Sequence, residues 1–466
     1  MPDLTVADKQ AGLVTQILAE WKTLAVLGGP ILIAQLAQMA NAVIDTVMAG
    51  RASAADLAGV GIGSSLWVPI LFFFVGTLSA LQPTISRHCG AGRLERVMPA
   101  TWQGLYIAAV CSVIMILLLI NAEPVLVLLQ LDERTSAIVH GYLYGFAWGI
   151  PALLLLAALR GLTDGLGHTR VIMAFSLLSA AVNLPLNYIF IYGKLGVPAM
   201  GGVGCGWATA LSNWIAALAL LVYLNRSSSY KKFHLVGDWV KPVWRDITKL
   251  LRLGTPIGFT MFVEVSMFSI IALFLAPLGA TIVAGHQIVL NAVSVFFMVP
   301  LSLGMALTLR VSFLVGADAP ERARLLARSA LLLAFGMSLV SAPILYFGRE
   351  FIAQLYTTDL AVQRVAISLF MFAAIFQVAD VIQVTAINAL RGYHDTAVPM
   401  LIMLLAFWGI CLPLGYVLTF TDVFGKAVGA PGFWIALSAG LTVACVLLVT
   451  RLFRLRVAHN EPATNH

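Results

Sequence analysis

The feature that most constrains this chain is a succession of apolar stretches, each roughly 20 residues long. A stretch of that length crosses a bilayer as an α-helix, because a helix satisfies its backbone hydrogen bonds internally. Hydrophobic residues make up 60% of the chain and charged residues 11%, unlike a soluble domain. The stretches are continuous rather than alternating, which argues against a β-barrel. The sequence therefore predicts an all-α polytopic membrane protein with twelve transmembrane helices, at residues 24–48, 54–80, 100–121, 138–160, 170–192, 205–224, 254–276, 284–309, 328–347, 365–389, 398–419 and 431–453.

Basic residues fall mainly in the loops on one side of the predicted membrane. Of the 28 Lys and Arg residues, 22 share a side with the two termini and 6 lie on the other side. Because loops rich in Lys and Arg stay in the cytoplasm, both termini are predicted to be cytoplasmic. The polar residues 1–22 lead directly into the first span without a cleavable signal pattern. This distribution accounts for the net charge of +7 without a nucleic-acid partner.

The two halves of the chain repeat each other. Four short motifs recur in the same order at offsets of 226 to 231 residues; one is Ala158–Asp164, which returns as Ala389–Asp395. Collinear matches of this kind indicate a duplication, and six spans in each half make the two repeats parallel. The predicted organisation is a cytoplasmic tail, an N-lobe, a cytoplasmic loop, a C-lobe and a second cytoplasmic tail, at residues 1–23, 24–224, 225–253, 254–453 and 454–466.

Three acids lie well inside the predicted spans: Asp45 in the first, Glu264 in the seventh and Asp380 in the tenth. A charge at the bilayer centre costs roughly 2.5–3.5 kcal/mol on insertion scales, and such residues usually mark ion or substrate pathways. We place no basic residue inside the spans, so the interior is expected to attract cations. A carboxyl there can hold a proton and release it when a cation arrives, which is the minimum for exchanging H⁺ or Na⁺ against another cation.

Amide side chains accompany these acids at helical spacing. One interpretation is that they hydrogen-bond between helices, worth about 0.6–2 kcal/mol each, and the other is that they line the pathway. Gln35, Gln38 and Asn41 share a polar face with Asp45 in the first span. The supporting polar residues predicted for the sites are Gln38, Asn41, Asn183, Asn187, Gln287, Asn291, Gln377 and Asn388.

The duplication does not extend to the acids. At the local offsets Glu264 corresponds to Gln38 and Asp380 to Gly149, whereas Asp45 corresponds to Ile271. The helical scaffold therefore does not require these carboxyls. We expect coupling-ion chemistry in the C-terminal half, which holds two of the three, and a separate part for Asp45.

Motifs for enzymatic chemistry are missing from the sequence. It has no GxxxxGK[ST] phosphate loop, no HExxH and no other nucleophile or metal constellation. The five cysteines lack ligand spacing, and most of them fall inside apolar spans, as packing residues do. We therefore predict a protein that is not an enzyme and has no cofactor beyond its coupling ion.

Twelve spans in two parallel repeats resemble the multidrug and toxic compound extrusion (MATE) transporters. Residues 44–50, Ile-Asp-Thr-Val-Met-Ala-Gly, are similar to the end of that family's first helix, and Glu264 and Asp380 match the acids of its NorM branch. The resemblance covers about residues 24–453. It implies two six-helix lobes in a V, alternating access, and efflux of cationic drugs and dyes driven by H⁺ or Na⁺ from a bacterial-type inner membrane. It also implies that Glu264 and Asp380 bind the coupling cation and so form a possible Na⁺ site. By the same resemblance, Asp45 handles substrate or protons.

The coupling ion and one competing function stay open at this point. Some relatives carry a tyrosine in the eighth helix near the cation, whereas residues 295–298 here read Val-Phe-Phe-Met, which favours protons over Na⁺. The competing function is a lipid-linked oligosaccharide flippase of a related fold. A flippase for anionic pyrophosphate lipids should have basic residues inside its cavity, and we place none there. The expected partners are small organic cations and the lipid bilayer, with the protein acting as a monomer.

Overall fold

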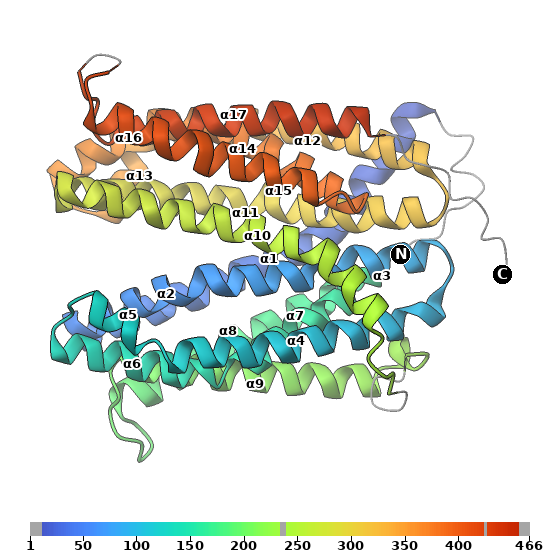
Figure 1. Cartoon of the computed structure of the whole chain (residues 1–466), viewed down its shortest axis with the longest axis horizontal. Coiled ribbons are helices and arrows are strands. Elements are labelled where there is room, and N and C mark those ends of the chain that lie inside the picture. The colour runs from blue at the N-terminus through green and yellow to red at the C-terminus, as the bar shows by residue number, and fades with distance from the viewer. Residues whose placement is uncertain (1–11, 234–238, 424–425, 456–466) are drawn as a thin grey trace. The chain divides into compact units, whose positions relative to one another are not determined.

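The computed structural model describes residues 12–233, 239–423 and 426–455. Its described residues form helices joined by short turns and loops, without strands (Figure 1). This confirms the all-helical prediction. The helices are α1 (Leu13–Ala52), α2 (Ala54–Ser79), α3 (Leu81–Gly90), α4 (Val97–Ile120), α5 (Glu123–Leu128), α6 (Glu133–Ala147), α7 (Ile150–Gly165), α8 (Thr169–Tyr192), α9 (Gly202–Arg226), α10 (Trp244–Leu275), α11 (Ala280–Gly316), α12 (Pro320–Phe347), α13 (Arg349–Tyr356), α14 (Leu360–Gly392), α15 (Ala397–Leu404), α16 (Leu412–Phe420) and α17 (Pro431–Arg454).

Eleven helical segments of the described chain are long and apolar enough to cross a membrane. A twelfth span is the pair α6 and α7, which bends by 46° at its break. The break follows from local sequence, because Pro151 cannot continue the hydrogen-bond ladder of a preceding helix and is tolerated in a first turn. The span predicted at 398–419 is also interrupted, by a π-helical segment, Leu405–Cys411, between α15 and α16. Twelve spans result when the bent pair counts as one.

The chain packs into two compact units whose boundaries differ from those expected of the two lobes. Of the described residues, the first unit contains 30–233 and 239–258, and the second contains 12–29 together with 259–423 and 426–455. The first part of α1 therefore packs with the second unit, and the first part of α10 packs with the first unit. Both changes of unit fall beside a proline inside a helix, Pro30 in α1 and Pro256 in α10.

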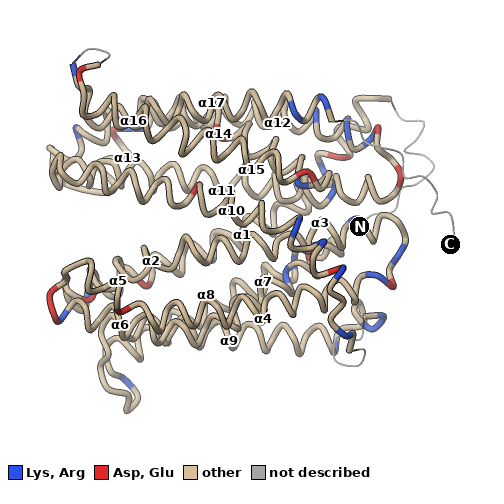
Figure 2. Tube along the Cα trace, in the orientation of Figure 1, with Lys and Arg blue, Asp and Glu red and all other residues tan. Residues whose placement is uncertain are grey.

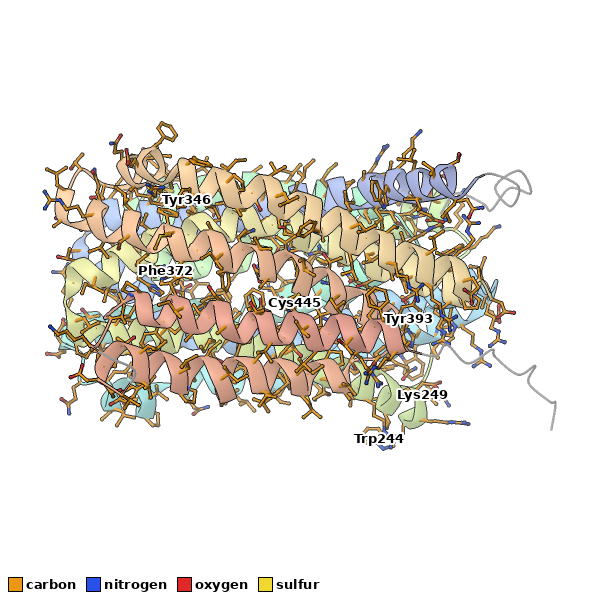
Figure 3. The ribbon with its side chains drawn as sticks, turned by 90° about the horizontal axis from the view of Figure 1, so that it is seen from above. Trp244, Lys249, Tyr346, Phe372, Tyr393 and Cys445 are labelled. Atoms are coloured by element: carbon orange, nitrogen blue, oxygen red, sulfur yellow. The ribbon has the colours of Figure 1, made fainter. Side chains whose placement is uncertain are left out.

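Two helices begin in segments that the sequence assigned to a tail and a loop. α1 starts at Leu13 and α10 at Trp244, about ten residues before the apolar stretches predicted at 24 and 254. Trp244 and Lys249 project from the first turns of α10 (Figure 3), and Trp244 is 78% exposed. Helical hydrogen bonding continues into polar sequence, which hydropathy alone does not register. The tail residues 1–11 and 456–466 lie outside the described part of the chain.

Within the second unit, α14 is the central helix. It packs against α11, α12 and α17, and most of its side chains from Leu369 onward are buried. In the first unit, α9 packs against α6, α7 and α8. In each unit most Lys and Arg gather at one end of the helices (Figure 2). The five cysteines, all in the described chain, form no disulfide.

Candidate functional site

Asp45 lies in the first unit within a compact polar cluster. Its Oδ1 accepts a hydrogen bond from Asn187 Nδ2 at 2.6 Å, and its Oδ2 accepts one from Thr209 Oγ1 at 3.0 Å. Asn183 completes the cluster: its Oδ1 accepts from Asn187 at 2.8 Å, and its Nδ2 donates to Thr209 at 3.3 Å. Both asparagines are fully buried. The structure thus brings together Asp45 and the two amides that the sequence placed one helical turn apart on α8.

Thr209 is a site residue that the sequence prediction missed. Its hydroxyl can donate to a carboxylate and accept from a carboxylic acid, so the cluster suits Asp45 in either protonation state. The sequence did contain a sign of this role. Residues 206–212 form one of the repeated motifs and return at 432–438, where the apolar Ile435 takes the place of Thr209. Asn187 likewise corresponds to Gly415, and the ring of Phe433 fills the space where a side chain at Gly415 would lie. The partners of Asp45, like Asp45 itself, are therefore absent from the other repeat.

The polar face expected along α1 divides between different surroundings. Gln35 accepts a hydrogen bond from Arg160 Nη1 at 3.1 Å. Asn41 is half-buried, and its Oδ1 has no hydrogen-bond partner among the described residues. Gln38 is exposed. Only Asp45 itself joins the cluster with Asn183 and Asn187.

The expectation that the interior holds acids but no base is wrong. Arg160, on α7, pairs with the fully buried Asp164 at 3.1 Å. Arg310, on α11, is 4% exposed. The sequence analysis assigned Arg160, Arg310 and Arg391 to loops. In the structure each belongs to a helix, because α7 runs to Gly165, α11 to Gly316 and α14 to Gly392. The last turns of these helices therefore hold bases inside the fold.

Glu264 and Asp380 lie together in the second unit. Asp380, on α14, is 5% exposed, and Glu264, on α10, is half-buried. The two carboxyls are close enough to interact electrostatically, and Glu264 also interacts with the guanidinium of Arg391. Arg391 Nη1 reaches Asn388 Oδ1 at 3.5 Å on the same helix. Glu264 thus interacts with an acid and with a base, where only another acid was expected.

The amides predicted to support this site fall into three groups. Asn388 joins α14 to α11, because Thr308 donates to both its backbone and side-chain oxygens at 2.7 and 3.2 Å. Gln377 is fully buried, and neither of its side-chain polar atoms has a hydrogen-bond partner among the described residues. Gln287 is exposed and Asn291 half-buried. Asn388 therefore joins helices, whereas Gln377 is left with unused hydrogen-bonding groups one turn from Asp380.

The repeat position of Asp380 has no room for a side chain in the first unit. A Cβ added at Gly149 would lie 2.6 Å from the Cα of Ala210 on α9. Gly149 also sits at the break between α6 and α7, where the chain turns. Close helix packing therefore excludes an acid at this position. The repeat position of Asp380 therefore lacks an acid for a steric reason.

Two further observations concern metal binding and a nearby groove. Among the described residues, no three His, Cys, Asp or Glu side chains are grouped as metal ligands. An apolar groove of about 700 Å³ lies between α12, α14 and α17, and its lining includes Tyr346 and Cys445 (Figure 3). Its α14 residues lie on the face opposite Asp380 at 100° per residue. This groove is therefore separate from the acid pair.

Comparisons of the chain with known proteins all lead to one protein family. The family model described as MatE matches residues 30–189 and again residues 256–417, once in each half, which confirms the duplication. A protein of Idiomarina loihiensis named "Probable multidrug resistance protein NorM" is 43% identical, with 93% of this chain and 94% of that protein covered. "Multidrug resistance protein PmpM" of Pseudomonas aeruginosa is also 43% identical, with 94% of this chain and 92% of that protein covered.

Solved structures share the fold at lower identity. The eukaryotic MATE transporter AtDTX14 superposes with a TM-score of 0.86 at 20% identity, covering 95% of this chain and 97% of its own. The Vibrio cholerae MATE transporter VcmN in its bent form gives a TM-score of 0.81 at 20% identity, covering 94% and 98%. At these identities the likeness concerns the fold.

Proposed function

This chain belongs to the MATE family, and we propose that it exports cationic, amphipathic drugs and dyes by antiport with H⁺, with Na⁺ as the alternative coupling ion. The observation that carries the proposal is the pair of acids, Glu264 and Asp380, whose carboxyls interact electrostatically inside the membrane-spanning part of the second unit. The relatives named for multidrug resistance support drug efflux as the process. We place the protein in a bacterial inner membrane with both termini cytoplasmic, in keeping with its bacterial relatives and its 22 to 6 distribution of basic residues.

The charges around the acid pair bear on what the site exchanges. With both carboxyls ionised and Arg391 charged, the three side chains carry a net charge of −1. Binding one proton or one monovalent cation brings this set to neutrality, which a low-dielectric interior favours. We therefore propose one coupling ion per cycle at this site. The buried amide of Gln377, which has no hydrogen-bond partner among the described residues, adds a neutral oxygen one turn from Asp380, available to a bound cation or to water.

Asp45 has a different environment, and we propose a different task for it. Each of its oxygens already receives one hydrogen bond, from Asn187 and from Thr209. Such a carboxylate is oriented and has no basic partner in its hydrogen-bond cluster. We propose that Asp45 alternates between binding a proton and interacting with the cationic substrate, while the acid pair of the second unit couples transport to the ion gradient.

The coupling ion can be identified by separating the two gradients. Purified protein in proteoliposomes should export a cationic dye when only a pH gradient is imposed. A Na⁺ gradient at constant pH should drive little export. The measurement is dye fluorescence over time, with protein-free liposomes as control. Export under the Na⁺ gradient alone would overturn the preference for protons, and export under neither gradient would overturn antiport itself.

Replacing Thr209 by valine should impair transport without unfolding the protein. The change keeps the side-chain volume but removes the donor to Asp45 Oδ2, and a hydrogen bond to a charged group contributes about 1.5–3 kcal/mol. We expect gradient-driven efflux to fall by about ten-fold or more. The matched control is Thr101→Val, because Thr101 is a buried threonine of the same unit whose hydroxyl bonds only to the Val97 carbonyl of its own helix. Equal efflux in the two variants would remove Thr209 from the site.

A further inference from the structure

A hollow in the first unit lies between the last turns of α1 and α8, apart from the apolar groove of the second unit. Its volume is about 740 Å³, within the range of roughly 300–1,000 Å³ typical of small-molecule sites. The two helices run in the same direction here: Asn187 bonds Asp45, and one turn further on Tyr192 Oη donates to the Met48 carbonyl at 3.1 Å. Positions on the two helices thus advance together toward the ends at Arg51 and Lys194.

The hollow is apolar along its length and basic at one end. Val43, Val47 and Leu184 line the apolar part and are 52%, 48% and 50% exposed. Arg51 and Lys194 line the far end, and neither forms an ion pair with any described residue. Its lining includes no acidic side chain. These two are also among only six basic residues on the basic-poor side of the chain. A cationic drug would be repelled from this end.

Two tyrosines stand between the apolar and basic parts. The rings of Tyr188 and Tyr192 meet edge to face at 5.6 Å, and the hydrogen bond to Met48 fixes the ring of Tyr192. Tyr188 is 52% exposed. Tyrosine is typical of the level where acyl chains meet headgroups, because its ring is apolar and its hydroxyl polar. The order along the hollow is therefore apolar, aromatic and basic.

We propose that this hollow binds an anionic phospholipid from the leaflet that meets the ends of α1 and α8. One acyl chain lies along Val43, Val47 and Leu184, and the phosphate lies between Arg51 and Lys194. A free inorganic anion would use the two bases but leave the apolar walls uncovered. A lipid with a neutral headgroup would cover the walls but gain less from the bases. Anionic phospholipid is the occupant that matches both parts.

The bound lipid would bear on the Asp45 cluster. Ile44 and Met48 line the hollow, and they flank Asp45 on the same turns of α1. Asp45 itself points to α8 and α9, where Asn187 and Thr209 bind it. A ligand that binds the folded state stabilises it by mass action, so an occupied hollow holds this segment of α1 against α8. Lipid binding and the geometry around Asp45 are thereby linked.

The test measures lipid binding to the full-length protein in a neutral detergent. Phosphatidylglycerol, phosphatidylethanolamine with the same acyl chains, and inorganic phosphate are titrated separately, with native mass spectrometry and thermal unfolding as readouts. The test variant is Arg51→Gln with Lys194→Gln. The control variant is Arg134→Gln with Lys426→Gln, which removes two basic residues from the same side that do not line the hollow. Circular dichroism checks that both variants are folded.

The proposal expects phosphatidylglycerol to bind the wild type and the control variant equally and to raise their unfolding temperatures. In the test variant its affinity should fall on the order of ten-fold, because each interfacial base contributes attraction to an anionic surface. Equal binding of phosphatidylethanolamine, or stabilisation by inorganic phosphate alone, would overturn it. So would an equal loss in the control variant. A third variant, Val47→Trp, fills the apolar part and keeps both charges; undiminished phosphatidylglycerol binding there would also contradict the proposal.

Discussion

Replacing Asp380 by asparagine should abolish gradient-driven dye efflux while leaving the protein folded. The carboxyl is 5% exposed on the central helix of the second unit, and asparagine matches its size without its charge or its proton. The remaining charges of Glu264 and Arg391 then cancel, so the site no longer requires a cation to become neutral. Glu264→Gln should have the same effect for the matching reason. We expect efflux in either variant to fall to the level of protein-free liposomes.

The control for these variants is Asp395→Asn. Asp395 also belongs to the second unit, but it forms an ion pair with Arg451 at 2.8 Å beyond the end of α14. Its replacement should leave efflux close to that of the wild type, because its partner Arg451 is 44% exposed and ion pairs near the surface contribute little, about 0–1 kcal/mol. Size-exclusion profiles and helical circular dichroism establish that all three variants are folded. Full efflux in a folded Asp380→Asn or Glu264→Gln variant would refute the assignment of the coupling site.

The largest effect on stability is expected at Glu20, which the sequence assigned to a polar tail. Glu20 is 4% exposed and accepts hydrogen bonds from Arg310 Nε and Nη2 at 2.8 and 3.1 Å. Arg322 adds a third bond at 2.9 Å. Trp21, the next residue, donates to Ser329 at 3.2 Å. These contacts fix the first part of α1 onto α11 and α12.

Glu20→Gln should lower the free energy of unfolding of the second unit by about 3–5 kcal/mol. The reason is that the buried Arg310 loses its counter-charge, and an uncompensated buried charge is costly. Thermal and denaturant unfolding in detergent measure the change. The matched control is Glu321→Gln, since Glu321 is 81% exposed and pairs only with Arg324; its effect should stay within about 1 kcal/mol.

A double variant separates the lost charge pair from lost packing. Replacing both partners, Glu20→Gln with Arg310→Met, leaves no unpaired guanidinium at this position and should be less destabilising than the sum of the single changes. A Glu20→Gln variant as stable as Glu321→Gln would show that the cluster contributes nothing. Additive single and double effects would show that Glu20 and Arg310 act independently.

The sequence determined the features that depend on local composition. Whether roughly 20 residues are apolar is a property of that segment alone, so the spans, the all-helical class and the positions of Asp45, Glu264 and Asp380 within them followed directly. The duplication followed from motif order, and the family model matches each half once. The pairing of Asn183 with Asn187 was also accessible, because residues four apart share one face of a helix.

Only the tertiary structure decided which side chains meet, because those contacts join residues far apart in the sequence. Thr209 meets Asp45 across 164 positions, and Glu20 meets Arg310 across 290. Hydropathy also could not show that helices continue past their apolar stretches. For this reason the sequence analysis assigned Glu20, Arg160 and Arg391 to loops or tails, whereas the structure has them in helices. In a membrane the apolar length of a helix is set by the lipid, whereas its buried polar partners are set by neighbouring helices. The first is encoded residue by residue, and the second exists only once the helices pack.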